Sequence, residues 1–208
     1  MDMQFYGANC ISLGTKQVRL VIDDNLAELG GKSITRDGDV VLFTGSHSEA
    51  VKQPKLVIDM PGEYEVQGIF IYGIQARAHM DEADKTTATM YKVMNEELSV
   101  LITGHIYPDV SDDQLEAIGM IDVMFVPVGG HGYTLDPTGA SQLIKRVEPK
   151  IVIPTHYADN GLNYPVPQGD LQEALKGLAI DPKETVSKLK VKPADLTDVT
   201  QLIVLERA

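Results

Sequence analysis

The sequence contains one cysteine, no tryptophan and few basic residues. A single cysteine, Cys10, excludes an intramolecular disulfide framework and is typical of a protein kept in a reducing cytoplasm. Lysine and arginine number 18 against 30 aspartates and glutamates, and the resulting formal charge of −12 opposes binding to nucleic acid or to an anionic membrane. No apolar run approaches the length of a membrane span, and the N-terminus lacks a signal-peptide pattern. We therefore expect a cytoplasmic protein without nucleic acid or membrane partners.

The motifs of several enzyme classes are also missing. There is no Gly-x-Ser-x-Gly nucleophile turn, no Walker loop and no dinucleotide-binding glycine pattern. Cys10 lies in an early apolar segment, where core packing is a more ordinary role than catalysis. With 208 residues, 43% of them hydrophobic, the chain is long enough to bury a substantial core, and we expect one domain over residues 1–208.

The chain does contain five histidines, and each follows a segment that is expected to be a strand. They are His47 after residues 40–43, His79 after 69–74, His105 after 100–103, His131 after 123–128 and His156 after 151–155. Ligand crevices in α/β sheets open at the carboxyl ends of strands. This placement therefore predicts a site lined by histidines.

The first half of the sequence is patterned as strands. Residues 3–13 and 17–22 are expected to form two strands around a turn at residues 14–16. Residues 89–93 and 99–103 are expected to pair as a hairpin. The pattern therefore predicts a sheet in this half of the chain.

The second half alternates between strands and helices. Ser111 and Gln114 have the spacing of a helix capping box, and Asp136 and Asp170 are expected to cap two further helices. Residues 123–128 form an almost uninterrupted apolar run, which is typical of a strand covered on both faces. The alternation predicts an α/β protein.

Imidazole and carboxylate groups at strand ends are ligands that zinc, manganese and iron prefer. Glu49, two residues after His47, adds a carboxylate to one of the histidine loops. A metal with one open position acidifies a bound water and supplies a hydroxide nucleophile near neutral pH. The residues favour metal-dependent hydrolysis over serine or cysteine catalysis.

Several segments together carry a family resemblance that covers nearly the whole chain. They include Tyr6-Gly7-x-x-Cys10, Pro61-Gly62-Glu63-Tyr64-Glu65-Val66, Pro127-Val128-Gly129-Gly130 and Ile153-Pro154-x-His156-Tyr157. In these segments the sequence resembles the metallo-β-lactamase superfamily, in the branch near the ascorbate-phosphate lactonase-like metal-dependent hydrolases. The resemblance implies the αβ/βα four-layer sandwich, with two mixed sheets face to face, helices outside and the site at one edge. It also implies a small-molecule substrate, phosphorylated or ester-like.

The metal-binding motif is where this sequence departs from the family. Relatives carry Thr/Ser-His-x-His-x-Asp-His after the central strand, whereas residues 44–50 read Thr-Gly-Ser-His-Ser-Glu-Ala. Of the motif, only His47 is unchanged. Gly45 and Ala50 replace its other two histidines, and Glu49 replaces its aspartate.

Three further histidines match later family positions. His79 matches the next ligand, His156 the final ligand, and His105 stands where relatives place a metal-bridging aspartate. The metal ligand set that the resemblance implies is His47, Glu49, His79, His105 and His156. Glu49 is also the candidate catalytic base.

Two interpretations remain open. In the first, the centre is rebuilt around one Zn, Mn or Fe ion rather than two, and the chain is a hydrolase that acts through a metal-bound hydroxide. In the second, the chain is a non-catalytic, metal-free member of the fold that serves as a binding or scaffold protein. His105 favours the first, because it replaces one ligand type with another. Gly45 and Ala50 favour the second, because they delete ligands.

Other polar residues near the strand ends are expected to support the site. Asp23 is expected to orient a neighbouring loop or ligand, as carboxylates behind metal ligands do. His131 has no ligand counterpart in the family, so a surface or substrate-facing position is expected. Tyr133 and Tyr157 are candidates for pocket lining or for packing.

Overall fold

A computed structural model describes residues 1–49 and 52–208. Its elements in chain order are β1 Asp2–Gly7, β2 Cys10–Gly14, β3 Arg19–Ile22, β4 Val40–Leu42, β5 Leu56–Ile58, β6 Gly62–Val66, β7 Ile69–Ala76, β8 Ala88–Met94, β9 Ser99–Ile102, α1 Asp112–Ile118, β10 Val123–Pro127, α2 Pro137–Val147, β11 Ile151–Thr155, α3 Leu171–Leu178, β12 Pro182–Val186, β13 Leu189–Lys190, the short 3₁₀ helix η1 Pro193–Asp195 and β14 Gln201–Leu205. The expected hairpin of residues 89–93 and 99–103 is confirmed by the antiparallel pairing of β8 with β9.

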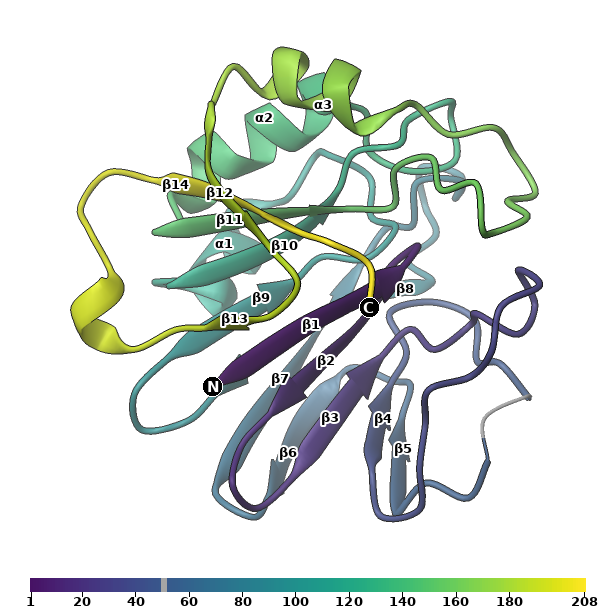
Figure 1. Ribbon diagram of the computed structural model, residues 1–208, viewed down its shortest axis with the longest axis vertical. Helices are drawn as coiled ribbons and strands as arrows, with labels where there is room; N and C mark the ends of the chain where they lie inside the picture. The colour runs from purple at the N-terminus through teal and green to yellow at the C-terminus, as the bar shows by residue number, and fades with distance from the viewer. Residues whose placement is uncertain (50–51) are drawn as a thin grey trace.

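Two mixed sheets face each other (Figure 1). The first has six strands in the order β13-β1-β2-β3-β4-β5, and the second has eight in the order β12-β14-β11-β10-β9-β8-β7-β6. The central strands β9, β10 and β11 run parallel, as do β3, β4 and β5. This architecture confirms the expected metallo-β-lactamase type of sandwich.

The apolar run that becomes β10 supplies two hydrophobic layers at once. All five residues of the strand are buried, and successive side chains of a strand point to opposite faces. Val123 and Phe125 pack in the core between the two sheets, whereas Met124 and Val126 pack in the core under the helices. A strand covered on both faces was therefore correctly expected here.

The three α-helices of the described chain pack against the second sheet (Figure 1). The Ser111 hydroxyl accepts a hydrogen bond from the Gln114 amide, and the Gln114 side chain accepts one from the Ser111 amide. Asp136 and Asp170 likewise accept hydrogen bonds from the amides three residues on. All three predicted helix starts are confirmed. None of the helices in residues 1–49 and 52–208 has the length and apolar character of a membrane span.

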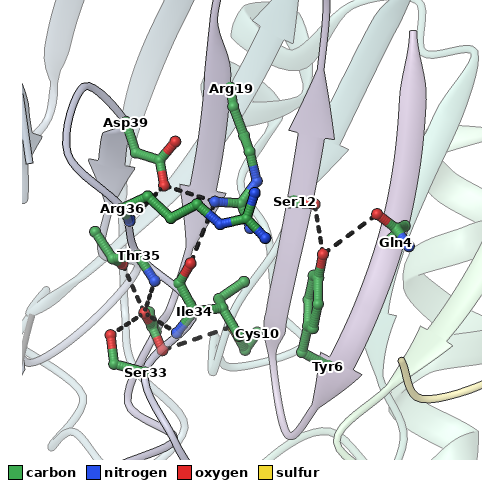
Figure 2. Close-up of polar contacts among 11 residues, drawn as sticks. Gln4, Tyr6, Cys10, Ser12, Arg19, Ser33, Ile34, Thr35, Arg36 and Asp39 are labelled. Atoms are coloured by element: carbon green, nitrogen blue, oxygen red, sulfur yellow. Dashed lines mark hydrogen bonds and ion pairs between the residues drawn. The ribbon is translucent and has the colours of Figure 1, made fainter.

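The helix layer expected outside the first sheet is not present in the described chain, and the segment 23–39 covers that face instead. The buried Asp24 carboxylate accepts hydrogen bonds from Ser33 Oγ at 2.7 Å and from Thr35 Oγ1 at 2.6 Å. Figure 2 labels these two donors, Ser33 and Thr35. Arg19 donates to Asp39 at 2.6 Å and to the Ile34 carbonyl at 3.2 Å. These bonds hold a weakly patterned segment in a fixed position on the sheet.

One expectation about strands was wrong, and the edge strand β12 was missed. Residues 3–13 form two strands instead of one, because the chain reverses at Ala8, which has a φ of 50°. Strand β12 was not expected, because its residues are mostly exposed and show no apolar alternation. It forms at an edge of the second sheet by pairing with β14.

Candidate functional site

Strand direction brings three of the histidines to the same edge of the second sheet. Strands β7 and β9 both run antiparallel to β8, so they point the same way, and β9, β10 and β11 are parallel. The loops that follow β7 and β9 are joined by a hydrogen bond of 2.7 Å from the His79 amide to the His105 carbonyl. His156 directly follows β11.

A cavity of about 660 Å³ lies at this edge, between the ends of the two sheets. The second sheet contributes His79, His105 and His156, and the first sheet contributes Asp23 and Thr44. The remaining lining residues are Ala8, Asn9, Asn25, Glu28, Leu29, Gly45, Ser46, Ala78, Met80, Thr87, Ala88, Tyr133, Asn163, Tyr164 and Pro165. The cavity is large enough for a small-molecule ligand.

The two sheets approach each other closely at Thr44. The Asp23 carboxylate accepts hydrogen bonds from the Thr44 amide at 2.7 Å and from the Thr44 hydroxyl at 2.6 Å. The Thr44 carbonyl accepts from the Thr89 amide of β8 at 2.9 Å. Gly104, with a φ of +62°, leaves room for Thr44, because a Cβ atom at position 104 would collide with the threonine side chain. Asp23 thus orients a neighbouring loop, as predicted.

Aromatic rings surround the two most enclosed histidines. The centroids of the His105 and His156 rings lie 4.4 Å apart, with the rings edge to face at 81°. The Tyr133 ring lies 5.0 Å from the His105 ring and 5.8 Å from the His156 ring. The Tyr164 ring lies 5.1 Å from that of His156.

Burial keeps both of these histidines uncharged at neutral pH. It lowers the pKa of His105 to about 3; the neighbouring His156 adds to this effect and a hydrogen bond to the backbone of Tyr133 opposes it. Burial lowers the pKa of His156 to about 4, against the opposing hydrogen bond to Gln168. Burial also raises the pKa of Asp23 to about 6, because the two bonds from Thr44 only partly offset the loss of solvation.

The hydrogen bonds of His156 fix its protonation. Its Nδ1 lies 3.1 Å from Gln168 Oε1, and Gln168 Nε2 donates to the Val166 carbonyl at 2.7 Å. Since the amide nitrogen of Gln168 is occupied by Val166, its oxygen faces the histidine and accepts from Nδ1–H. The lone pair of His156 is therefore on Nε2.

Most of the unpaired buried polar atoms belong to residues that line this cavity, although the atoms themselves are enclosed by protein. Within the described residues, five buried side-chain nitrogen or oxygen atoms lack a hydrogen-bond partner, and four of them belong to cavity-lining residues. The four are Asn9 Nδ2, Asn25 Oδ1, His79 Nδ1 and His105 Nδ1. An unpaired buried polar group is destabilising by about 1–3 kcal/mol, so such groups are rare away from functional sites.

The other two predicted ligands do not line the cavity. The His47 ring stacks on Phe43 with centroids 4.6 Å apart, and its Nδ1 lies 3.6 Å from Asp59 Oδ2. Glu49 is exposed and Ala50 lies outside the described residues. His131 is exposed on the loop after β10, which agrees with the surface position considered for it. The roles of His47 and Glu49 in binding or catalysis stay predictions.

Several lining residues were not anticipated from the sequence. Asn9 is buried, and its Oδ1 accepts from the Thr155 hydroxyl at 2.9 Å. Tyr164 accepts from the Ala8 amide at 3.3 Å and donates to the Tyr157 carbonyl at 3.1 Å. The only sequence signal for Asn9 was its place inside the Tyr6-Gly7-x-x-Cys10 segment; no local pattern marks Tyr164.

Comparison with known families identifies the fold from sequence. Residues 2–156 match the family model described as the beta-lactamase superfamily domain. The chain belongs to this family. A UPF0173 metal-dependent hydrolase of Thermoplasma acidophilum is 46% identical over 46 residues, a stretch that covers 21% of this chain and only 20% of that protein.

Solved structures agree with this membership of the metallo-β-lactamase superfamily. A candidate Zn-dependent hydrolase of the superfamily from Thermotoga maritima superposes with a TM-score of 0.77 at 24% identity, over 99% of both chains. The metallo hydrolase Igni18 of Ignicoccus hospitalis superposes with a TM-score of 0.64 at 18% identity, over 100% of this chain and 95% of that one. At these identities the likeness establishes the fold.

The names of these relatives imply a metal, and the residues of this cavity do not fit the metal centre that those names imply. In the described part of the chain, no group of three or more histidine, cysteine, aspartate or glutamate side chains is placed to hold a metal ion. Of the five predicted ligands, only three line the cavity. The nitrogens of these three rings are not gathered around one point, as zinc binding at about 2.0–2.1 Å per ligand requires.

Proposed function

We propose that this chain binds a small polar molecule directly in the histidine cavity, without a metal centre of the superfamily type. The observation that carries this proposal is a cavity of about 660 Å³ lined by His79, His105, His156 and Asp23, in a described chain where no such group is placed to hold a metal ion. A small polar molecule makes each of its hydrogen bonds separately, at about 2.7–3.2 Å, so it does not need ring nitrogens that converge on one point. The second interpretation of the sequence, a metal-free binding protein, is therefore preferred over the mononuclear hydrolase.

The mononuclear hydrolase is the rival function, and one feature favours it. The Nδ1–H of His156 donates to Gln168, and its Nε2 lone pair is free. Histidines that bind a metal commonly donate their other ring N–H in this way, which orients the ligating nitrogen. A metal site built on it needs further ligands from His79 and His105. Under this rival, movement of those rings on metal binding would complete the set.

Titration with zinc and manganese distinguishes the two functions. Protein purified without a histidine tag is expected to take up neither ion at a site tighter than about 1 μM, since a three-ligand set is not assembled. Calorimetry measures this, and a hydrolase screen with each ion added is expected to show no activity. The paired variants are His156→Ala in the cavity and His131→Ala on the exposed loop. Uptake of one equivalent that is lost only in His156→Ala would overturn the proposal in favour of the mononuclear hydrolase.

A further inference from the structure

The second sheet ends at strand β6, and no other segment of the described chain makes a backbone hydrogen bond to its outer edge. Strands β6 and β7 are joined by a two-residue turn, Gln67 and Gly68, in which both residues have a positive φ. In such a turn the flanking residues, here Val66 and Ile69, form a hydrogen-bonded pair. Along an antiparallel ladder these pairs alternate with pairs that make no hydrogen bond. The turn therefore fixes which backbone groups of β6 face β7 and which face outward.

The outward groups belong to two glutamates. Glu63 and Glu65 stand opposite Tyr72 and Phe70 at the positions without hydrogen bonds, so their backbone N–H and C=O groups point away from β7. The side chains of both glutamates are exposed, and they lie on the same face of the sheet because they are two residues apart. The edge therefore offers two N–H donors and two C=O acceptors to a further strand.

Exposed apolar side chains gather around this edge. Three of the six large hydrophobic residues that are exposed in the described chain lie here: Leu56 on the edge strand β5 of the first sheet, Met60 in the short link from β5 to β6, and Phe70 on β7. Met60 is 64% exposed and Phe70 42%. Charged side chains on an edge strand commonly protect it from aggregation, but exposed apolar residues around it are typical of an interaction surface.

The side chains of β6 indicate which residues an added strand would need. On one face, that strand would meet the carboxylates of Glu63 and Glu65. The nearby cation on this face, Lys92 of β8, donates instead to a carbonyl at the end of helix α1 at 2.6 Å. On the other face, the strand would meet Tyr64 and Val66, which are half-buried against the core between the sheets. Opposite charges in facing cross-strand pairs stabilise a sheet, so a matching strand alternates lysine or arginine with apolar residues.

A second copy of the chain would not match this edge. Two β6 strands that pair around a two-fold axis at Tyr64 place Glu63 of each copy opposite Glu65 of the other, and like charges in facing pairs are destabilising. We propose that β6 takes up an extended segment of a partner protein in which basic and apolar residues alternate, so that this segment becomes a further strand of the second sheet. The interaction does not depend on what the cavity binds, because β6 does not line the cavity.

Peptides of defined pattern test the class of partner. The probes, each acetylated and amidated, are Lys-Val-Lys-Val-Lys-Val-Lys, the same residues ordered as Lys-Lys-Lys-Lys-Val-Val-Val, and the alternating peptide with glutamate in place of lysine. Calorimetry measures binding, and backbone amide signals in NMR locate it. The alternating basic peptide is expected to shift the amide signals of Glu63 and Glu65, and to bind about tenfold or more tightly than either of the other two. Its binding should weaken as salt is raised.

Substitutions in β6 separate backbone pairing from charge. Glu65→Pro removes an N–H that points outward, so it is expected to keep the pairing with β7 and to weaken peptide binding by about tenfold or more. The double variant Glu63→Gln with Glu65→Gln keeps the backbone groups and is expected to weaken binding by about three- to tenfold. The matched control is Glu184→Gln with Glu206→Gln, which removes two exposed charges near the opposite edge of the same sheet. It is expected to change binding by less than about twofold.

Each other outcome overturns the proposal. Equal binding of the two basic peptides, or equal effects of the β6 glutamine variant and its control, would show that the net charge of −12 attracts the peptide without a specific site. Preference for the glutamate peptide, or no binding of any peptide, would show that the assigned partner chemistry is wrong. A dimer in light scattering that Glu65→Pro dissociates would assign the edge to a second copy. If Glu65→Pro fails to fold, the glutamine variant and the peptide series still decide.

Discussion

Lowering the pH from about 7 to about 5 is expected to reduce the free energy of unfolding by roughly 2–3 kcal/mol. The cause is the pair His105 and His156, whose pKa values fall from an ordinary 6.5 to about 3 and about 4. In the unfolded chain both rings take up protons as the pH falls through 6.5, whereas in the folded protein they stay neutral until about pH 4. Acidification from pH 7 to pH 5 therefore lowers the free energy of unfolding by about 2 kcal/mol for each ring.

Asp23 acts in the opposite direction over part of the same range. Its pKa is raised from 3.8 to about 6, so the folded protein binds a proton on this carboxyl that the unfolded chain does not yet bind. Between pH 7 and pH 5 this uptake stabilises the folded state by about 1 kcal/mol. The two histidines exceed it, and the net change is a loss of stability.

Urea denaturation at half-unit steps of pH measures this balance. Asp23→Asn removes the opposing contribution and keeps a side-chain oxygen that can accept from the Thr44 amide. The variant is expected to lose about 4 kcal/mol over the same range, more than the natural protein loses. A free energy of unfolding that stays constant or rises on acidification would show that the two histidines are not held neutral by burial.

Most of the fold was predictable because the strands and helix caps are encoded locally. The strand at residues 123–128 is apolar on both faces, and Ser111, Asp136 and Asp170 have side chains that cap only in one local geometry. Strand β12 was missed because an exposed edge strand owes its existence to its neighbour β14 rather than to its own side chains.

The site was predictable only in part. Strand ends place His79, His105 and His156 at one edge, because parallel strands finish together. The direction of the His47 side chain could not be predicted in this way. His47 lies in a loop, where side chains do not alternate between two faces as they do in a strand. Its position depends on contacts with Phe43 and with the distant Asp59. Contacts between segments that lie far apart in the sequence likewise bring Asn9 and Asn25 to the cavity.

Gly129→Ala is expected to destabilise the protein by about 3 kcal/mol or more. Gly129 follows β10, and its carbonyl accepts from the Gly169 amide at 2.8 Å. A Cβ atom at this position would overlap the His156 carbonyl oxygen and the Gln168 side-chain oxygen. The His156 backbone has little freedom to yield, because its amide is bonded to the Ala8 carbonyl at 2.8 Å. The substitution should therefore displace both His156 and the Gln168 side chain that fixes its protonation.

Gly45→Ala is the matched control, because Gly45 also lines the cavity but a Cβ there meets no atom within 4 Å. Its free energy of unfolding is expected to change by less than about 1 kcal/mol. Urea denaturation gives both values, and the His156 imidazole signal reports whether the ring has moved. We expect that signal to shift in Gly129→Ala and to stay in place in Gly45→Ala. Equal stability of the two variants would mean that the loop after β10 has room to move away from His156. In that case the close approach of Gly129 to the His156 carbonyl would not hold this histidine in position.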